Sequence, residues 1–426
     1  MANEHNNKRP TAASMLNIAA FCTALFAVGG LSIAMEKPTY SEQEKRDLAK
    51  MPELTLKGYW DGSLASGIDA FYSDTFPFRD ALISLGSTLE EMRGLRLDDA
   101  KIHETAPSTS EPEVPTEPGS GTETENSSSS KAEETAVGEQ NGSVFIYKGM
   151  AMSMFGGSQS MGKWYADVIN SYAAALPDVQ VYDIVVPTSI EFYLPEKYQD
   201  ISAPEKPNID YIYSQMSDAV KTVDAYGEIA QHTDEYIYFR TDHHWTSLGA
   251  YYAYQQLCGT LSLTPFDPAA HTALTAENFY GTHYSKARTW NAVPDTITYY
   301  DLPNTLTIWN VTAAGQPTDG QTTGLYDTDK LNVYDKYAMF LHGNNGLSRI
   351  EGSGTGRILV IKDSYANCFT PYLTANYAEI DVVDFRNYNY GLDQLIADNG
   401  YDQILVLYSF DSFKSDPYLY RAGVTG

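Results

Sequence analysis

The chain has 426 residues, of which 43% are hydrophobic and 13% aromatic, so it can bury a substantial core and is not disordered throughout. Its formal net charge is −27, and no basic stripe runs through the sequence. This argues against nucleic acid as a partner, because phosphate binding needs clustered lysines and arginines.

The first segment is apolar. Ala12 to Met35 carries no formal charge, is long enough to cross a bilayer, and shows no polar face at helical period. Lys8 and Arg9 precede it, so the positive-inside rule keeps the amino terminus in the cytoplasm. We therefore expect residues 1–36 to be a cytoplasmic tip and a transmembrane signal anchor, single-pass in the cell membrane, with the rest of the chain extracytoplasmic. Cleavage by signal peptidase after Ala34 is the alternative.

A helical region and a linker come next. Residues 41–102 are predicted to form a helical first part of the catalytic domain, because Ser41-Glu42-Gln43-Glu44 is typical of a helix start and residues 60–93 carry apolar side chains three and four positions apart. Arg79 is expected to pair with Asp74 or Asp80 in a structural contact. Residues 103–142 are dominated by Pro, Ser, Thr, Gly and Glu, with nine glutamates and one lysine. This segment is predicted to be a disordered acidic linker or loop, so the acidity of the chain is partly a property of the linker.

The rest of the chain, residues 143–426, is predicted to be an α/β domain. Apolar strand-like runs alternate with amphipathic helices, which is typical of a parallel sheet. Asn278 to Val333 departs from this rhythm and is predicted to be a β-rich insertion over the site, and the alternation resumes at Arg357. The expected elements are a strand at 143–147, a helix at 161–175, a strand at 179–186, a helix near 209–226, a short strand at 237–239 and a helix at 246–256.

Asp242, His243 and His244 lie between the last two of these elements, so we expect them at the carboxyl end of a strand, where ligands bind in open α/β sheets. In an extended loop, side chains two residues apart share a face, so Asp242 and His244 should point together while His243 points away. A carboxylate beside an imidazole fixes its tautomer and supports a general base. The alternative is that Asp242 and His244 only cap the following helix and satisfy each other.

Ser364 is the candidate nucleophile. Ile358 to Ile361 is a buried-strand pattern, Lys362-Asp363-Ser364 follows directly, and a short helix is expected from Tyr365. This places the serine at a strand-to-helix turn, with its own N–H and the helix terminus available to an oxyanion. The alternative is a helix N-cap, a frequent use of Ser and Asp at such a position.

Five short motifs stand out in the sequence. They are T-D-H-H-W-T at 241–246, D-T-F-P-F-R at 74–79, F-Y-G-T at 279–282, F-L-H-G-N at 340–344 and K-D-S at 362–364. Together they resemble the DHHW family, which is similar to the alginate O-acetylation proteins of bacterial envelopes, whose catalytic domain is a permuted relative of the SGNH hydrolases. The resemblance implies an SGNH hydrolase-like, flavodoxin-like fold, with a permuted, three-layer parallel sheet.

The same resemblance implies Ser364 as nucleophile, His244 as base and Asp242 as its orienting acid, in agreement with the reading from the residues. Asn344 falls where the family carries Gly-Gly-Asn, so its amide is implied as an oxyanion donor, although Gly343-Asn344 is also a good turn pair. His342 and Asn345 depart from the family pattern. His243 is expected to be structural, and His283 and Lys286 are candidates to line the cleft.

The expected function is O-acetyl transfer to a cell-surface or secreted polysaccharide, with an integral membrane acyltransferase as acetyl donor. The alternatives are an acetylesterase on the same glycans and a non-catalytic glycan-binding or envelope scaffold protein. No cofactor is expected. A metal site from Asp242, His243 and His244 is disfavoured because adjacent histidines in an extended loop diverge. Cys258 and Cys368 are expected to be buried free thiols, with a disulfide as the alternative.

Overall fold

The protein is described here by a computed structural model. It describes residues 144–156, 159–287, 292–309, 319–388 and 392–410, together with residues 100–103, 412 and 419. Nearer the amino terminus it describes residues 37–41, 46–79 and 82 and scattered positions between 19 and 35. The chain divides into two compact units, Met1–Leu95 and Arg96–Gly426. The predicted linker lies, apart from its first residue, outside the described residues, so its disorder and the predicted domain limits stay predictions.

The smaller unit contains two short strands followed by two helices. Strand β1 (Tyr40–Ser41) pairs with β2 (Arg46–Asp47), and helix α2 (Leu56–Asp61) precedes α3 (Ser63–Asp74). Gly62 separates the helices with a left-handed φ of 82°. Helices thus form at 56–61 and 63–74, but the helix predicted to start at Ser41 is wrong, because Ser41 lies in β1 and pairs with Arg46 of β2.

Two further predictions concern this unit. Arg79 lies 4.0 Å from the Asp74 carboxylate, which is one of the two pairings expected.

Among the described residues, no helix is long and apolar enough to span a membrane. More than half of the span predicted at 12–35 lies outside the described residues.

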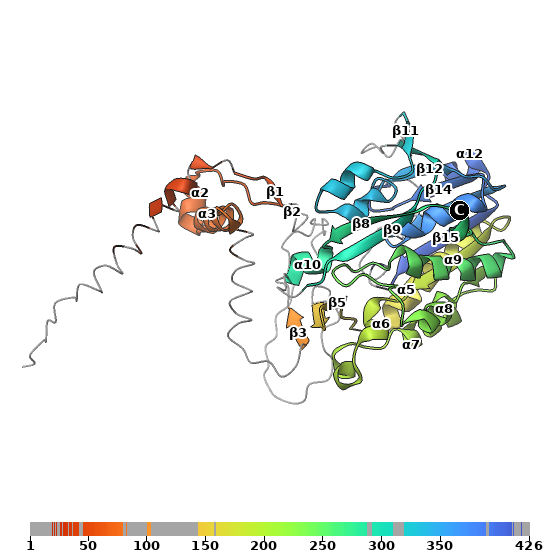
Figure 1. The fold of residues 1–426 in the computed structure, drawn as a ribbon. Coiled ribbons are helices and arrows are strands. Elements are labelled where there is room, and N and C mark those ends of the chain that lie inside the picture. The colour runs from red at the N-terminus through yellow and green to blue at the C-terminus, as the bar shows by residue number, and fades with distance from the viewer. Residues whose placement is uncertain are drawn as a thin grey trace, which may run out of the picture. The chain divides into compact units, whose positions relative to one another are not determined.

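The larger unit is organised around an eight-stranded mixed sheet with the order β11-β10-β12-β14-β13-β15-β6-β7 (Figure 1). The five strands from β14 to β7 run parallel, and β12, β10 and β11 add antiparallel pairs at one edge. The strands are β6 (Gln180–Val186), β7 (Val220–Thr222), β10 (Thr305–Trp309), β11 (Gln321–Gly324), β12 (Leu347–Glu351), β13 (Arg357–Lys362), β14 (Glu379–Val383) and β15 (Gln403–Ser409).

Both faces of this sheet are buried, because its central strands carry apolar side chains on both faces. In β13, Ile358 and Val360 join one hydrophobic cluster, while Leu359 and Ile361 join a second. Helices α8 (Ala225–Ile229), α9 (Ser247–Leu261) and α11 (Ala366–Phe369) contribute to the first cluster, and α5 (Gln159–Ala175), α7 (Lys206–Gln215) and α12 (Asp393–Asn399) to the second. The fold is therefore a mixed α/β fold with a large sheet between two helical layers.

Smaller elements surround the sheet. Strands β3 (Ala100–His103), β4 (Val144–Tyr147) and β5 (Met150–Ser153) form an antiparallel sheet, and β8 (Ala273–Phe279) pairs with β9 (Asp295–Tyr300). The remaining helices are α6 (Ser189–Tyr193) and α10 (Thr282–Ala287), with 3-10 turns η1 (Glu196–Ile201), η2 (Ala230–His232), η3 (Pro268–Ala270), η4 (Thr328–Asn332), η5 (Lys336–Met339) and η6 (Thr370–Ala375).

The alternating pattern predicted most of these elements but not all of them. The helices at 161–175 and 246–256 and the strands at 179–186 and 358–361 are confirmed as α5, α9, β6 and β13. The helix predicted near 209–226 is wrong in its second half, where the β-branched residues of β7 pair with β6 and Asp224 caps α8. The strand at 143–147 forms, as β4, but in the separate antiparallel sheet. The purely parallel sheet is also wrong, because β10 and β11, from the β-rich insertion, and β12 extend the main sheet as antiparallel strands.

Candidate active site

The Asp242–Trp245 segment lies on a tight turn and not at the end of a strand. Tyr238 forms a bridge with Trp245, and the Thr246 N–H donates to the Ile237 carbonyl at 2.9 Å. The strand predicted at 237–239 is therefore wrong, since its hydrogen bonds go to the returning chain of this turn and not to the main sheet. Thr246 then caps α9 by accepting the Gly249 N–H.

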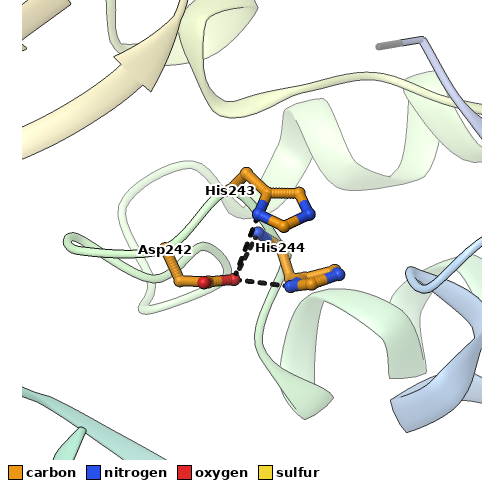
Figure 2. Close-up of side chains that lie close together, drawn as sticks. All are labelled: Asp242, His243 and His244. Carbon is orange, nitrogen blue, oxygen red and sulfur yellow. Dashed lines mark hydrogen bonds and ion pairs between the residues drawn. The ribbon is translucent and has the colours of Figure 1, made fainter. Parts of the chain in front are cut away.

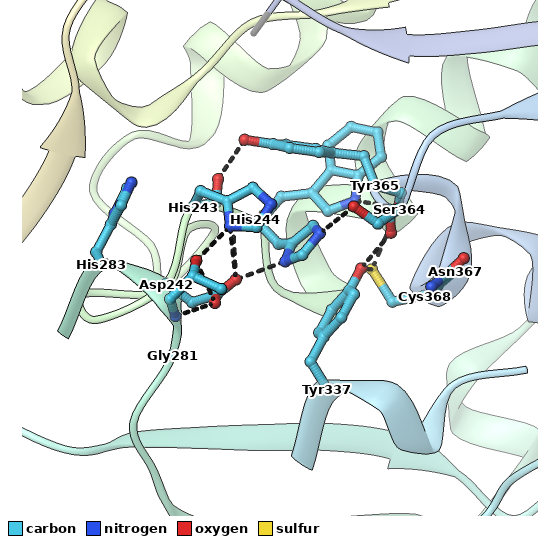
Figure 3. Close-up of polar contacts among 12 residues, drawn as sticks. Asp242, His243, His244, Gly281, His283, Tyr337, Ser364, Tyr365, Asn367 and Cys368 are labelled. Atoms are coloured by element: carbon cyan, nitrogen blue, oxygen red, sulfur yellow. Dashed lines mark hydrogen bonds and ion pairs between the residues drawn. The ribbon is translucent and has the colours of Figure 1, made fainter. Parts of the chain in front are cut away.

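His244 lies between Asp242 and Ser364, as Figure 3 shows. The His244 Nδ1 is 2.5 Å from Asp242 Oδ1, and the His244 Nε2 is 2.8 Å from Ser364 Oγ. A carboxylate only accepts, so Nδ1 carries the proton and Nε2 offers its lone pair to the serine hydroxyl. All three side chains are buried, with Ser364 the most exposed at 9%. The three residues that the sequence singled out are thus brought together in the order that activates a serine.

Ser364 is held in a turn that Asp363 builds. The Asp363 carboxylate accepts the Tyr365 N–H at 2.9 Å and the Ser409 N–H at 2.8 Å, which ties the turn to the neighbouring strand β15. The Asp363 carboxylate therefore stabilises the turn, while the Ser364 hydroxyl contacts His244 and caps no helix. The Ser364 N–H donates to no acceptor within the described part of the chain. Helix α11 has only four residues, so the helix terminus expected to assist an oxyanion contributes little.

Two aromatic side chains fix the base and the turn. Trp245, which is fully buried, donates from Nε1 to the Tyr365 carbonyl at 2.8 Å. The Tyr337 ring stacks on the His244 ring, with centroids 3.9 Å apart and planes at 11°, and its hydroxyl donates to the Ser364 carbonyl at 2.9 Å. Sequence reasoning missed Tyr337, because one tyrosine among 33 carries no signal of its own.

The outer oxygen of Asp242 is held by the motif at 279–282. The Thr282 N–H donates to Asp242 Oδ2 at 2.8 Å and the Thr282 hydroxyl at 3.1 Å. A Cβ placed on Gly281 would lie 2.2 Å from both the Cβ and Oδ2 of Asp242, so only glycine fits beside the carboxylate. Burial opposes ionisation of Asp242, but the charges of His244 and His243 and these hydrogen bonds hold its pKa well below the usual range.

Asp295, at the start of β9, anchors the base of the turn. It is fully buried and accepts the Arg240 N–H at 2.8 Å, the Thr241 N–H at 2.7 Å and the Thr241 hydroxyl at 2.5 Å. Burial raises the pKa of Asp295, although these bonds oppose the shift. Sequence reasoning missed this contact, because Thr241 and Asp295 are 54 positions apart in the chain.

His243 does not diverge from His244 as expected. Its ring centroid lies 3.8 Å from that of His244, and its Nδ1 is 3.6 Å from Asp242 Oδ1 (Figure 2). The same nitrogen also bonds the Thr282 hydroxyl at 2.6 Å. The possible metal ligands of Asp242, His243 and His244 all lie within 4.8 Å of one another. However, the His244 Nδ1 that donates to Asp242 cannot also bind a metal, so a metal site and the Ser364–His244–Asp242 arrangement exclude each other.

The other histidine considered for the cleft is buried. His283 is 1% exposed and lies between the Ala151 carbonyl, 2.8 Å from its Nδ1, and the Ser153 hydroxyl, 2.9 Å from its Nε2. The expectation that it lines the cleft is therefore wrong. The Lys286 side chain lies outside what the structure describes.

Asn344 is exposed at the end of a turn with three consecutive left-handed residues. Its Oδ1 accepts from Lys362 Nζ at 2.9 Å and from Asn367 Nδ2 at 3.1 Å. The amide NH₂ therefore faces away from these donors. Such an amide can act as a hydrogen-bond donor to an oxyanion, but the role itself stays a prediction.

Cys258 and Cys368 are both buried free thiols, as expected. Cys368 is close to the site, and the Tyr337 hydroxyl lies 3.4 Å from its Sγ. Burial raises the pKa of Cys368 to about 12 and that of Cys258 to about 11, so neither thiol is ionised near neutral pH.

The fold and the site together define a mixed α/β protein with a Ser–His–Asp arrangement at the carboxyl end of a central strand. The chain belongs to the DHHW family, since the model of that family, described as DHHW protein, matches residues 44–117 and 110–383. No protein among those with curated descriptions matches it.

The chain is also similar to solved structures. A DHHW family protein from Eubacterium siraeum DSM 15702 is 28% identical, with a TM-score of 0.59 over 66% of this chain and 95% of that one. Bacillus cereus PatB1, solved with a sulfonyl adduct, is 20% identical, with a TM-score of 0.54 over 65% and 97%, which shows the fold alone. The O-acetyltransferase domain of Pseudomonas putida AlgJ is 16% identical over 66% of this chain and 98% of that one, with a TM-score of 0.37.

Proposed function

We propose that this protein is a serine acyl-transfer enzyme that moves an O-acetyl group onto a hydroxyl of a polysaccharide through an acetyl-Ser364 intermediate. The observation that carries the proposal is the contact of Ser364 Oγ with His244 Nε2 at 2.8 Å while Asp242 holds the opposite nitrogen. The acetyl group and the glycan acceptor come from the likeness of the DHHW family to alginate O-acetylation proteins.

The reaction has two matched halves. In the first, His244 Nε2 takes the Ser364 proton while Oγ bonds to the acetyl carbon, and the imidazolium then protonates the leaving group as its bond breaks. In the second, the acceptor hydroxyl gives its proton to His244 and bonds to the acetyl carbon, and Oγ leaves with that proton. Asp242 stays ionised throughout and stabilises the imidazolium.

Each half passes through a tetrahedral intermediate with a negative oxygen. We assign its stabilisation to the Ser364 N–H and the Asn344 amide, because the first is uncommitted within the described residues and the second has its oxygen bonded by Lys362 and Asn367, which leaves its NH₂ group on the other side. Each such donor contributes about a hundredfold to a thousandfold in rate.

The donor and the location belong to the same proposal. An integral membrane acyltransferase would deliver the acetyl group, and residues 12–35 would anchor the domain on the outer side of the membrane, as their apolar, uncharged sequence suggests.

The test locates the transferred acetyl group on the protein and on the sugar acceptor. The protein is incubated with p-nitrophenyl acetate, with and without an oligosaccharide acceptor, and mass spectrometry locates the acetyl group. Acetyl on Ser364 that passes to sugar supports the transferase, and release to water alone identifies an acetylesterase. A phenylmethanesulfonyl fluoride adduct on the same residue would report the activated serine independently.

A pair of serine variants distinguishes acetylation of Ser364 from nonspecific acetylation elsewhere on the protein. Ser364→Ala should lose the adduct and all turnover, whereas Ser214→Ala, at an exposed serine of α7, should keep both. Equal activity in the wild type and Ser364→Ala, with oligosaccharide binding retained, would support a non-catalytic glycan-binding protein.

A further inference from the structure

A lysine is buried immediately before the turn that carries Ser364. Lys362, the last residue of β13, is 1% exposed, and lysines are almost never fully buried unless they are paired. Its Nζ lies 3.2 Å from Asp384 Oδ2 and 2.9 Å from Asn344 Oδ1. Burial lowers the pKa of Lys362, while the Asp384 charge opposes that shift.

The charge of Asp384 does not by itself require this lysine. Arg386 binds the same carboxylate through two nitrogens, Nε to Oδ1 at 2.8 Å and Nη2 to Oδ2 at 2.5 Å. Asp363, which follows Lys362 in the sequence and is also buried, provides a second carboxylate. Two cations, Lys362 and Arg386, therefore share this region with two anions, Asp384 and Asp363. Among the residues that the structure describes, only Lys362 and Asn367 donate a hydrogen bond to the Asn344 side chain.

The ammonium group decides which end of the Asn344 amide faces inward. An ammonium group has only donors, so the Asn344 atom against it must be the oxygen, and the Asn367 amide donates to that same oxygen at 3.1 Å. A flipped amide would place N–H groups against both donors and leave them unsatisfied. The Asn344 NH₂ group is therefore directed away from the buried lysine, and Asn344 is exposed.

The backbone that presents this amide is held as well. Leu341, His342 and Gly343 have φ values of 54°, 58° and 86°, a run that costs energy for residues with a Cβ and is found where structure is fixed for function. The Asn344 carbonyl accepts the Asn387 amide at 3.0 Å, and Asn345 donates to the Leu341 carbonyl at 2.7 Å. Hydrogen bonds therefore hold both the main chain of this turn and the side-chain oxygen of Asn344.

We propose that Lys362 is a positioning residue for catalysis, which holds the Asn344 amide with its NH₂ end toward the oxyanion formed at Ser364 and polarises that amide through its charge. This inference rests on the proposed acyl-transfer function. It gives the lysine of the K-D-S motif a role separate from those of Asp363, which builds the turn, and Ser364, which reacts.

The test is a double-mutant cycle on the full chain, with p-nitrophenyl acetate as substrate. Lys362→Met should lower kcat by about tenfold to a hundredfold while KM changes less than twofold, because the amide acts on the intermediate. Asn344→Ala should lower kcat by about a hundredfold or more, and the double variant should be no slower than Asn344→Ala alone. Lys362→Gln, which keeps an uncharged donor, should lie between the wild type and Lys362→Met.

Three outcomes would overturn the inference. The first is an unchanged kcat in Lys362→Met, and the second is a double variant whose loss is the product of the two single losses. Should both Lys362 variants fail to fold by circular dichroism, Asn367→Ala removes the other donor to the same oxygen. A kcat unchanged in that variant would be the third. A wild type that neither turns over nor forms a sulfonyl adduct at Ser364 would instead overturn the proposed function, and the inference with it.

Discussion

At the scale of single residues, Asp242 decides which His244 nitrogen faces the serine. Its Oδ1 lies 2.5 Å from His244 Nδ1 and also accepts the His244 N–H at 3.0 Å, so both the tautomer and the ring position depend on one oxygen. A neutral amide at this position can no longer stabilise an imidazolium.

Asp242→Asn should therefore lower kcat for p-nitrophenyl acetate by about a thousandfold to ten-thousandfold. The Ser364 hydroxyl and the oxyanion donors remain in place, so KM should change little. Steady-state kinetics measure both constants, and a kcat within tenfold of the wild type would show that Asp242 only caps the turn.

Gly281 gives a steric test of the same carboxylate. Gly281→Ala would place a Cβ 2.2 Å from Asp242 Cβ and Oδ2, so the carboxylate must shift. A shift of about 1 Å can cost about a hundredfold in kcat. Kinetics and thermal unfolding should show this loss together with reduced stability.

The matched control is Gly259→Ala, in α9, where an added Cβ meets nothing within 4 Å. Alanine favours helix over glycine by up to about 1 kcal/mol, so this variant should be as active as the wild type and slightly more stable. Equal activity in the two alanine variants would contradict the crowding at Asp242.

At the scale of elements, the turn at 341–343 has three consecutive residues with left-handed φ values. Gly343 has a φ of 86°, and the nearest atom to an added Cβ is 3.9 Å away, so any effect of alanine is conformational and not steric. Gly343→Ala should lower the free energy of unfolding by about 1 kcal/mol. The same substitution should also lower kcat, by more than the loss of stability accounts for, because the turn positions Asn344, the next residue in the chain. Urea unfolding and kinetics give the two values.

His342→Gly is the counterpart within the same turn. Glycine accepts the φ of 58° without strain, although the bond of His342 Nε2 to the Gly324 carbonyl at 2.9 Å is lost. We expect kcat within about threefold of the wild type, because Lys362 and Asn367 still hold the Asn344 amide. A large loss would mean that the His342 side chain, absent from the family pattern, takes part in the site.

Elements with a strong period were predictable, and elements that depend on distant partners were not. The runs that became α5, α9, β6 and β13 carry their own pattern, because one face or both must be buried whatever lies opposite. The turn at 237–246 resembles a strand in composition, but its partner is the chain returning through Trp245. The antiparallel edge likewise depends on pairing between segments far apart in the sequence.

The same distinction holds at the site. Asp242 and His244 are two residues apart, and Ser364 ends a strongly apolar strand, so local pattern was sufficient to single them out. Their supports come from elsewhere: Tyr337 stacks on His244 from 93 positions along the chain, and Asp295 reaches back to Thr241. Such contacts exist only once the fold is formed, and no periodicity records them.

At the scale of the whole molecule, different buried carboxylates change the stability of the fold with pH in opposite directions. Charged partners hold the pKa of Asp242 and Asp384 below the usual range despite burial, so their contributions are present above the unfolded pKa and are lost as the pH falls. Asp183, in the middle of β6, is different. It is fully buried and accepts one bond, from the Tyr165 hydroxyl at 2.6 Å, and its Oδ2 has no partner among the described residues. Burial raises its pKa to about 7.

Asp183 should therefore make the protein less stable as the pH rises toward neutrality. Its unfolded pKa is about 4, so between about pH 4 and 7 the folded state binds the proton and the unfolded state does not, and the stabilisation that this gives is lost as the pH rises through 7. Asp183→Asn mimics the protonated carboxyl at every pH. Its free energy of unfolding should exceed that of the wild type by an amount that grows by about 1 kcal/mol per pH unit between pH 5 and 7 and then levels off.

Urea unfolding at pH 5, 6, 7 and 8 measures this difference. Asp167→Asn, at an exposed i,i+4 pair with Lys163 on α5, is the control and should differ from the wild type by no more than about 0.5 kcal/mol across the series. A difference between Asp183→Asn and the wild type that stays constant with pH would show that Asp183 has the same ionisation state throughout this range. The pH dependence of stability near neutrality would then have to arise from other groups.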